Sequence, residues 1–155
     1  MKIYLATDHA GFELKEKLLG FLVDKGYELE DFGALSYDKQ DDYPDFILKA
    51  AQAVALDEGS KGIILGGSGQ GEAIVANKVK GIRAVVYYGG HEDIIRLSRE
   101  HNDANILSLG ARFLSEDEAK KSIELWLNTS FSEEERHKRR IQKIYNFEDK
   151  ERPTF

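Results

Sequence analysis

A glycine-rich stretch in the middle of the chain carries two side chains capable of proton chemistry, Ser68 and Glu72. The stretch reads Gly66-Gly67-Ser68-Gly69-Gln70-Gly71-Glu72, and its glycines let the backbone adopt positive φ and approach a ligand closely. An apolar run precedes it and a helix-compatible run follows it. We therefore predict a tight loop between a strand and a helix, whose free N–H groups suit a phosphate or a developing oxyanion.

The glycine spacing differs from two common nucleotide-binding motifs. A Walker A loop requires Lys followed by Ser or Thr after its last glycine, whereas this loop continues with Glu72 and an alanine. A dinucleotide fingerprint requires Gly-x-Gly-x-x-Gly, whereas Gly67, Gly69 and Gly71 are spaced Gly-x-Gly-x-Gly. These mismatches argue against a nucleotide- or flavin-binding module. Two alternatives stay open on residue types alone: a carboxylate base beside a ligand, or a turn in which Ser68 and Glu72 only cap a helix.

The composition limits the class of protein. The 155 residues, 41% hydrophobic and 32% charged, are typical of one globular domain with a single core. No apolar run approaches the ~18 residues of a membrane span and no signal peptide precedes the first strand, so we expect a cytoplasmic protein without a membrane partner. The net charge of −6 argues against nucleic acid as a partner. Without cysteine, and with four histidines that are not clustered, the chain is expected to hold no metal.

Strand-like and helix-like segments alternate along the chain. A capping box at Ser115 and Glu118 and a proline at position 44 mark two helix starts, and a last helix is expected over 133–147, before a tail over 148–155. On the first helix, Lys15 is expected to face solvent. Five segments have the length of strands: 2–7, 27–32, 62–65, 83–88 and 106–109.

This alternation predicts one α/β domain over 1–147, a three-layer αβα sandwich around a parallel five-stranded sheet. In such sheets ligands bind beyond the carboxyl ends of the strands, where the strand order reverses. Asp8-His9, the glycine-rich loop and Gly110-Ala111-Arg112 each follow a strand and should share that edge. His101-Asn102 precedes the last strand and should lie at the opposite edge. A second copy of the chain would be needed to bring them together, so a homodimer is expected, with a dimer of dimers left open.

Six stretches match a known family in its order along the chain: residues 7–12, 42–45, 66–72, 76–78 with 81–84, 99–105 and 136–140. Together they resemble the ribose-5-phosphate isomerase type B family, which includes the subunits of galactose-6-phosphate isomerase. The resemblance implies a flavodoxin-like (Rossmann-like) fold, no cofactor, and sites shared across a dimer. It implies conversion of ribose 5-phosphate to ribulose 5-phosphate through an enediolate, with a six-carbon substrate such as allose or galactose 6-phosphate as the alternative.

The resemblance also implies roles for individual residues. Glu72 corresponds to the base that moves a proton between C1 and C2, in a chain that has Gly66 where many members have a cysteine. His101 corresponds to the acid that opens the sugar ring. Ser68, with the backbone N–H groups of the loop, would stabilise the oxyanion. The implied substrate-binding residues are Asp8, His9, Tyr43, Gly67, Gly69, Gln70, Gly71, Asn102, Arg112, Arg136 and Arg140.

Plainer interpretations remain for several of these residues. His101 could cap the end of its helix, and Asp8 could cap the start of another. Arg136 and Arg140 lie on one helical stripe that the acidic residues 133–135 could neutralise, yet an anionic protein needs a local basic site to bind an anionic substrate. Because the loop lacks the family's cysteine, a sugar-phosphate-binding protein without catalytic activity is a further alternative.

Overall fold

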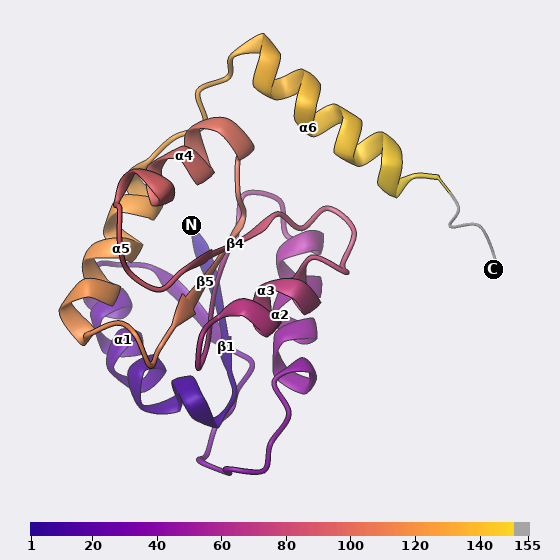
Figure 1. The fold of residues 1–155 in the computed structure, drawn as a ribbon. Coiled ribbons are helices and arrows are strands. Elements are labelled where there is room, and N and C mark those ends of the chain that lie inside the picture. The colour runs from indigo at the N-terminus through magenta and orange to yellow at the C-terminus, as the bar shows by residue number, and fades with distance from the viewer. Residues whose placement is uncertain (151–155) are drawn as a thin grey trace.

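The computed structural model describes residues 1–150 and consists of a parallel sheet between two layers of helices (Figure 1). All neighbouring strands run parallel. The predicted three-layer α/β architecture is therefore confirmed. The strands are β1 (Lys2–Thr7), β2 (Glu28–Asp31), β3 (Lys61–Gly66), β4 (Ala84–Tyr87) and β5 (Ile106–Gly110).

The helices divide between the two faces of the sheet (Figure 1). A short 3-10 turn, His9–Gly11, leads from β1 into the first helix. Helices α2 and α3 cover one face, and α1 and α5 cover the other, with α4 beside α5. The helices are α1 (Phe12–Asp24), α2 (Pro44–Leu56), α3 (Gln70–Ala76), α4 (Asp93–Asn102), α5 (Glu116–Asn128) and α6 (Glu135–Glu148).

The signals at the helix ends act as the sequence predicts. Ser115 accepts a hydrogen bond from the backbone of Glu118, whose side chain accepts one from the backbone of Ser115, so the capping box before α5 is formed. Pro44 occupies the first turn of α2, where its missing N–H costs no hydrogen bond. Gly26 and Gly59, just after α1 and α2, both have φ of +83°, which favours glycine.

The strand order is β2-β1-β3-β5-β4. It shares its first three strands with the flavodoxin order 2-1-3-4-5 and exchanges the last two, so β4 lies at the edge of the sheet. The chain leaves β1 for α1 on one face and leaves β3 for α3 on the other. The carboxyl ends of β1 and β3 therefore form the switch point at which α/β sheets bind ligands.

The central strands are apolar on both sides because helices cover both faces. In β1, Ile3 and Leu5 pack in the core beneath α1 and α5, while Tyr4 and Ala6 pack in the core beneath α2. The other buried strands alternate in the same way. Trp126 of α5 is fully buried in the first core. The two cores hold the carboxyl ends of the strands in a fixed arrangement.

The prediction that Lys15 faces solvent is wrong, because its side chain is fully buried. Its ammonium group forms an ion pair with Asp31, the last residue of β2, and lies 3.2 Å from a carboxylate oxygen of Glu16. The opposite charge of Asp31 compensates the loss of hydration. Asp31 also accepts a hydrogen bond of 2.9 Å from the N–H of Gly33, so the pair fixes the start of the loop after β2.

Helix α6 extends away from the rest of the molecule (Figure 1). His137 and Ile141 are its buried residues, whereas Ile144 of the same helix is 46% exposed. Arg83 donates a hydrogen bond of 2.5 Å to the hydroxyl of Tyr145 and so ties α6 to the start of β4. Of the predicted tail, residue 148 ends α6 and residues 151–155 lie outside the described part of the chain. Over residues 1–150, no helix has the length and apolar character needed to cross a membrane.

Candidate active site

The glycine-rich loop lies at the carboxyl edge of the sheet and is held by the chain that follows β5. The N–H groups of Ala111 and Arg112 donate to the carbonyls of Gly66 and Gly67 at 2.8 and 3.1 Å. The hydroxyl of Ser108 donates to the carbonyl of Gly69 at 2.7 Å. These bonds use the loop's carbonyl groups and fix it against its neighbour. Residue 69, immediately before α3, has φ of +78°, so a glycine is favoured there.

Glu72, in the first turn of α3, folds its carboxylate back over the end of β3. Its side chain is buried, and its Oε1 atom lies only 1.9 Å from where a Cβ at Gly66 would stand. Only glycine at position 66 leaves room for this placement. Burial raises the pKa of Glu72, a hydrogen bond to its own backbone opposes the rise, and the negative charge of Asp8 adds to it. A buried carboxylate with a raised pKa is suited to accept and return a proton near neutral pH.

Other predicted residues surround the loop. The hydroxyl of Ser68 accepts a hydrogen bond of 3.3 Å from the N–H of Gln70. The guanidinium of Arg112 lies 3.2 Å from where a Cβ at Gly67 would stand, which places a cation against the loop. Gly71 lies against the ring of Tyr43, at the start of α2, and a Cβ at position 71 would come within 2.8 Å of its hydroxyl oxygen. The structure therefore brings these predicted positions together around one loop.

Asp8 and His9 lie beyond β1 and form a cluster with Asp41, a residue that the sequence analysis missed. Asp8 is buried and accepts a hydrogen bond of 2.9 Å from the N–H of Ala10. One oxygen of Asp41 lies 3.0 Å from the backbone nitrogen of His9 and 2.6 Å from its Nδ1. Asp41 stands in a polar loop with no periodic signal, so only the fold reveals this contact.

The same cluster has the geometry of a metal site. Asp8, His9 and Asp41 offer ligand atoms within 4.8 Å of one another, the one such group found among residues 1–150. Carboxylate and imidazole ligands suit a divalent cation. The nearest ring nitrogen, however, already shares a short hydrogen bond with Asp41, and this bond accounts for the arrangement. The expectation that the protein holds no metal stays a prediction.

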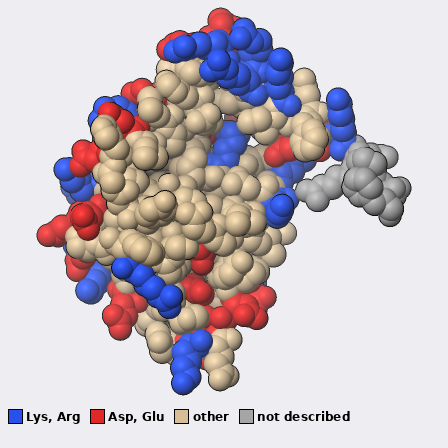
Figure 2. Space-filling model, viewed as in Figure 1, with Lys and Arg blue, Asp and Glu red and all other residues tan. Residues whose placement is uncertain are grey.

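A second group of candidate residues lies at the opposite edge of the sheet. His101, in the last turn of α4, stacks on His137 of α6 with ring centroids 4.2 Å apart. Burial lowers the pKa of His137, and His101 and Arg136 lower it further. Figure 2 shows basic side chains gathered over α6. Within the described residues Arg136 pairs with Glu134, whereas Arg140 forms no ion pair, so its guanidinium is available to an anion.

The two groups do not meet within one chain. Residues 101–102 lie before β5, and Arg112 lies after it. The four steps of ~3.3 Å between the first and last residues of β5 separate the edges by about 13 Å. The structure thus assembles the loop with Asp8, His9, Tyr43 and Arg112. It places His101, Asn102, Arg136 and Arg140 elsewhere, and the sequence predicts this placement for His101 and Asn102.

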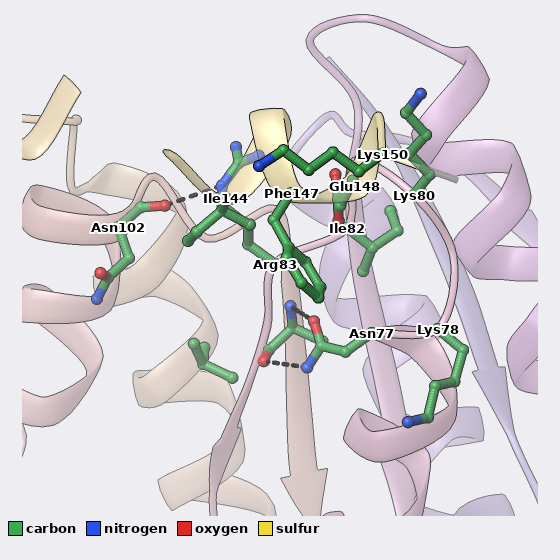
Figure 3. A pocket seen from close by; sticks show the side chains of 12 residues that line it. Asn77, Lys78, Lys80, Ile82, Arg83, Asn102, Ile144, Phe147, Glu148 and Lys150 are labelled. Atoms are coloured by element: carbon green, nitrogen blue, oxygen red, sulfur yellow. Dashed lines mark hydrogen bonds between the residues drawn. The ribbon is translucent and has the colours of Figure 1, made fainter. Parts of the chain in front are cut away.

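A groove of about 1090 Å³ separates α6 from the edge strand β4 (Figure 3). Ile144 and Phe147 of α6 line it, and Phe147 is 76% exposed. On the opposite wall, the side chain of Asn77 pairs with the backbone N–H and carbonyl of Ala84, at 2.8 and 2.9 Å. Asn102 also lines the groove, so the groove adjoins the second group of candidate residues. Large exposed apolar side chains around a groove are typical of a surface that another chain covers.

Comparisons with known proteins identify relatives of the chain. Residues 3–144 match the family model described as Ribose/Galactose Isomerase. The chain is 43% identical over 148 residues to the ribose-5-phosphate isomerase B of Mycobacterium leprae, covering 96% of this chain and 90% of that protein. The solved structure of ribose-5-phosphate isomerase B from Clostridium thermocellum matches with a TM-score of 0.89 and 45% identity, covering 96% of this chain and 97% of that one.

A second solved structure contains a sugar phosphate. Ribose-5-phosphate isomerase B from Mycoplasma genitalium, with bound ribulose-5-phosphate, matches with a TM-score of 0.91 and 36% identity. The match covers 97% of both chains, so the whole fold described above is shared.

Proposed function

This chain belongs to the ribose/galactose isomerase family, and on that premise we propose that it interconverts ribose 5-phosphate and ribulose 5-phosphate. The chemical support for the proposal comes from one observation. Glu72 holds a buried carboxylate, with a raised pKa, at the switch point of the sheet. A carboxylate in that state is the group needed to move a proton between adjacent carbons.

The reaction needs one base and one oxyanion site. In the open-chain aldose, Glu72 removes the proton from C2, the electron pair forms the C1–C2 double bond, and the C1 carbonyl oxygen becomes an oxyanion. The backbone N–H groups of residues 69–71, the hydroxyl of Ser68 and the cation of Arg112 support the developing charge. Glu72 then delivers the proton to C1, while the O2 hydroxyl passes its own proton to the C1 oxyanion and O2 becomes the ketose carbonyl. The number of protons on the sugar is unchanged.

We propose that two copies of the chain share each site. Ring opening by His101 and phosphate binding by Arg136 and Arg140 require residues that lie at the far edge of their own sheet. A second copy seated in the groove beside α6 would bring those residues to the loop that carries Glu72. Guanidinium groups bind phosphate oxygens bidentately, and Arg140 forms no ion pair within residues 1–150.

We also place the enzyme in the cytoplasm and expect it to work without a metal or an organic cofactor. The reaction itself transfers only protons within one substrate, so the residues named above supply every group that it requires. A doubly charged sugar phosphate does not cross a bilayer unaided, which places enzyme and substrate in the same compartment.

The test is turnover of ribose 5-phosphate by the purified protein and by Glu72→Gln. The amide keeps the shape of the side chain and cannot accept the proton, so kcat should fall about 100-fold or more while the circular dichroism spectrum is unchanged. Glu58→Gln, at an exposed glutamate, is the matched control and should keep full activity. Near-normal turnover by Glu72→Gln would show that another group is the base.

Two further assays distinguish the proposed function from a six-carbon substrate and from binding without catalysis. The family description includes galactose, so allose and galactose 6-phosphates are assayed beside ribose 5-phosphate. A clear preference for a six-carbon substrate would contradict the assignment of ribose. Incorporation of deuterium from D2O into ribulose 5-phosphate distinguishes an isomerase from a protein that only binds the sugar, because a binding protein catalyses no exchange.

A further inference from the structure

We infer that Asp41 is a positioning residue that holds His9 in one orientation and one tautomer, with the proton on Nδ1 and a free lone pair on Nε2. The inference rests on the proposed function, in which His9 contacts the sugar, and adds a residue that neither the motifs nor the comparisons assign. His9 would then accept a hydrogen bond from a sugar hydroxyl through Nε2.

The geometry around His9 carries the inference. A single oxygen, Oδ1 of Asp41, accepts from the backbone N–H of His9 at 3.0 Å and lies 2.6 Å from its Nδ1. A carboxylate can only accept hydrogen bonds, so Nδ1 must carry the proton in this contact. Asp8 stands on the same side of the ring, with its Oδ2 3.9 Å from Nδ1. Both neighbouring carboxylates therefore favour a protonated Nδ1.

The backbone contact and one aromatic contact restrict the ring further. Because the same oxygen binds the backbone and the ring of His9, the side chain cannot turn without breaking the bond to Nδ1. The ring also packs edge-on against Tyr37, with centroids 6.2 Å apart and planes at 89°. Nε2 lies on the side of the imidazole away from Nδ1, so it points away from Asp41. The imidazole remains 23% exposed, which leaves it accessible to a ligand.

The start of the loop is held independently of Asp41. The loop is anchored by backbone bonds, from Thr7 to the carbonyl of Gly33 at 2.7 Å and from Ala34 to the carbonyl of Thr7 at 2.6 Å. Within residues 1–150, the hydrogen bonds of the Asp41 side chain go to His9 alone, and its Oδ2 is buried without a hydrogen-bond partner. A buried, unsatisfied carboxylate oxygen is destabilising. The negative charge is therefore explained by its effect on His9 rather than by loop stability.

A fixed tautomer has a direct chemical consequence. Neutral imidazole has one donor and one acceptor nitrogen, and the hydrogen bond at one nitrogen decides the role of the other. A carboxylate on Nδ1 performs this orienting task for the histidine of the serine protease triad, where it also stabilises the imidazolium. Here the same arrangement would keep Nε2 as an acceptor for a sugar hydroxyl.

The test reads the tautomer directly. Long-range ¹H–¹⁵N correlation spectra of the protein with ¹⁵N-labelled histidine distinguish protonated Nδ1 from protonated Nε2, and the signals of His9 are those lost in His9→Gln. We expect Nδ1 to carry the proton in the unsubstituted protein. Asp41→Ala should move it to Nε2, and Asp41→Asn, whose amide oxygen can still accept, should largely restore it. Asp38→Asn, at an exposed aspartate of the same loop, should change neither spectrum nor turnover.

Kinetics give the second measurement. Asp41→Ala should lower kcat/KM about tenfold, the lower end of the effect of losing a carboxylate that orients a histidine, and Asp41→Asn should recover most of it. A protonated Nε2 in the unsubstituted protein, or spectra and kinetics unchanged in Asp41→Ala, would overturn the inference. So would signals of His9 that shift when a chelator is added, because these would indicate a bound metal. If the unsubstituted protein fails to isomerise ribose 5-phosphate, the proposed function is wrong, while the tautomer measurement still decides the role of Asp41.

Discussion

Replacing Gly66 with alanine tests whether the Glu72 carboxylate works in the position seen here. A Cβ at position 66 would lie 1.9 Å from Oε1 and 2.0 Å from the carboxyl carbon of Glu72. Non-bonded atoms settle near 3.5 Å, so the carboxylate must retreat by about 1.5 Å. Residue 66 is not among the positions with positive φ, so the backbone itself accepts alanine without strain.

The expected loss follows from this displacement. A misplacement of about 1 Å can lower a rate ~100-fold, so Gly66→Ala should reduce kcat for ribose 5-phosphate by about 100-fold or more. Substrate binding depends on other residues, so KM should change less than kcat. The double variant Gly66→Ala/Glu72→Gln should be no slower than Glu72→Gln alone, because both changes remove the same group from the same place.

Gly20→Ala is the matched control for this substitution. Position 20 lies within α1, and a Cβ there would meet no atom within 4 Å. This control should keep full activity and stabilise the protein by roughly 0.5–1 kcal/mol, since alanine favours helix over glycine. If Gly66→Ala also kept full activity, with a folded spectrum, the reasoning about the position of the base would be refuted.

Three further substitutions address charge. The reaction requires ionised Glu72, so kcat/KM rises with pH through the pKa of Glu72. Because the negative charge of Asp8 raises that pKa, Asp8→Asn should move the rising limb of the pH profile to lower pH. A rising limb at an unchanged pH would exclude an electrostatic effect of Asp8 on Glu72. Arg140→Ala should chiefly raise KM, and an equal loss for phosphorylated and plain sugars would contradict a phosphate contact. Lys15→Ala leaves Asp31 without its partner and should lower the free energy of unfolding by about 3 kcal/mol, measured by urea unfolding. An unchanged midpoint of urea unfolding would contradict this prediction.

The elements of the fold could be predicted because their signals are local. Apolar runs of strand length, a proline in the first turn of α2 and a capping box at Ser115 and Glu118 each act within a few residues. The lateral order of the strands could not be predicted from local signals. Alternation of strands and helices indicates parallel layers, but it does not say whether β4 or β5 pairs with β3, since both are short and apolar.

The residues that the sequence analysis missed depend on contacts between distant segments. Asp41 reaches His9 because the loop after β2 folds across the end of β1, and no periodicity connects positions 32 residues apart. Lys15 is placed on the surface by any hydrophobicity pattern, yet Asp31 makes its burial possible. Glu72 was identifiable because its loop has an unusual composition, whereas the contact of its carboxylate with Gly66 required coordinates.

The exchange of β4 and β5 determines which cation stands against the glycine-rich loop. Because β5 pairs with β3, the segment after β5 donates to the carbonyls of Gly66 and Gly67 and brings Arg112 to the loop. In the flavodoxin order, the segment after β4 would take that place instead. The permutation of two strands thus decides that a guanidinium lies against the loop, so the charge around the site is inherited from topology as well as from side chains.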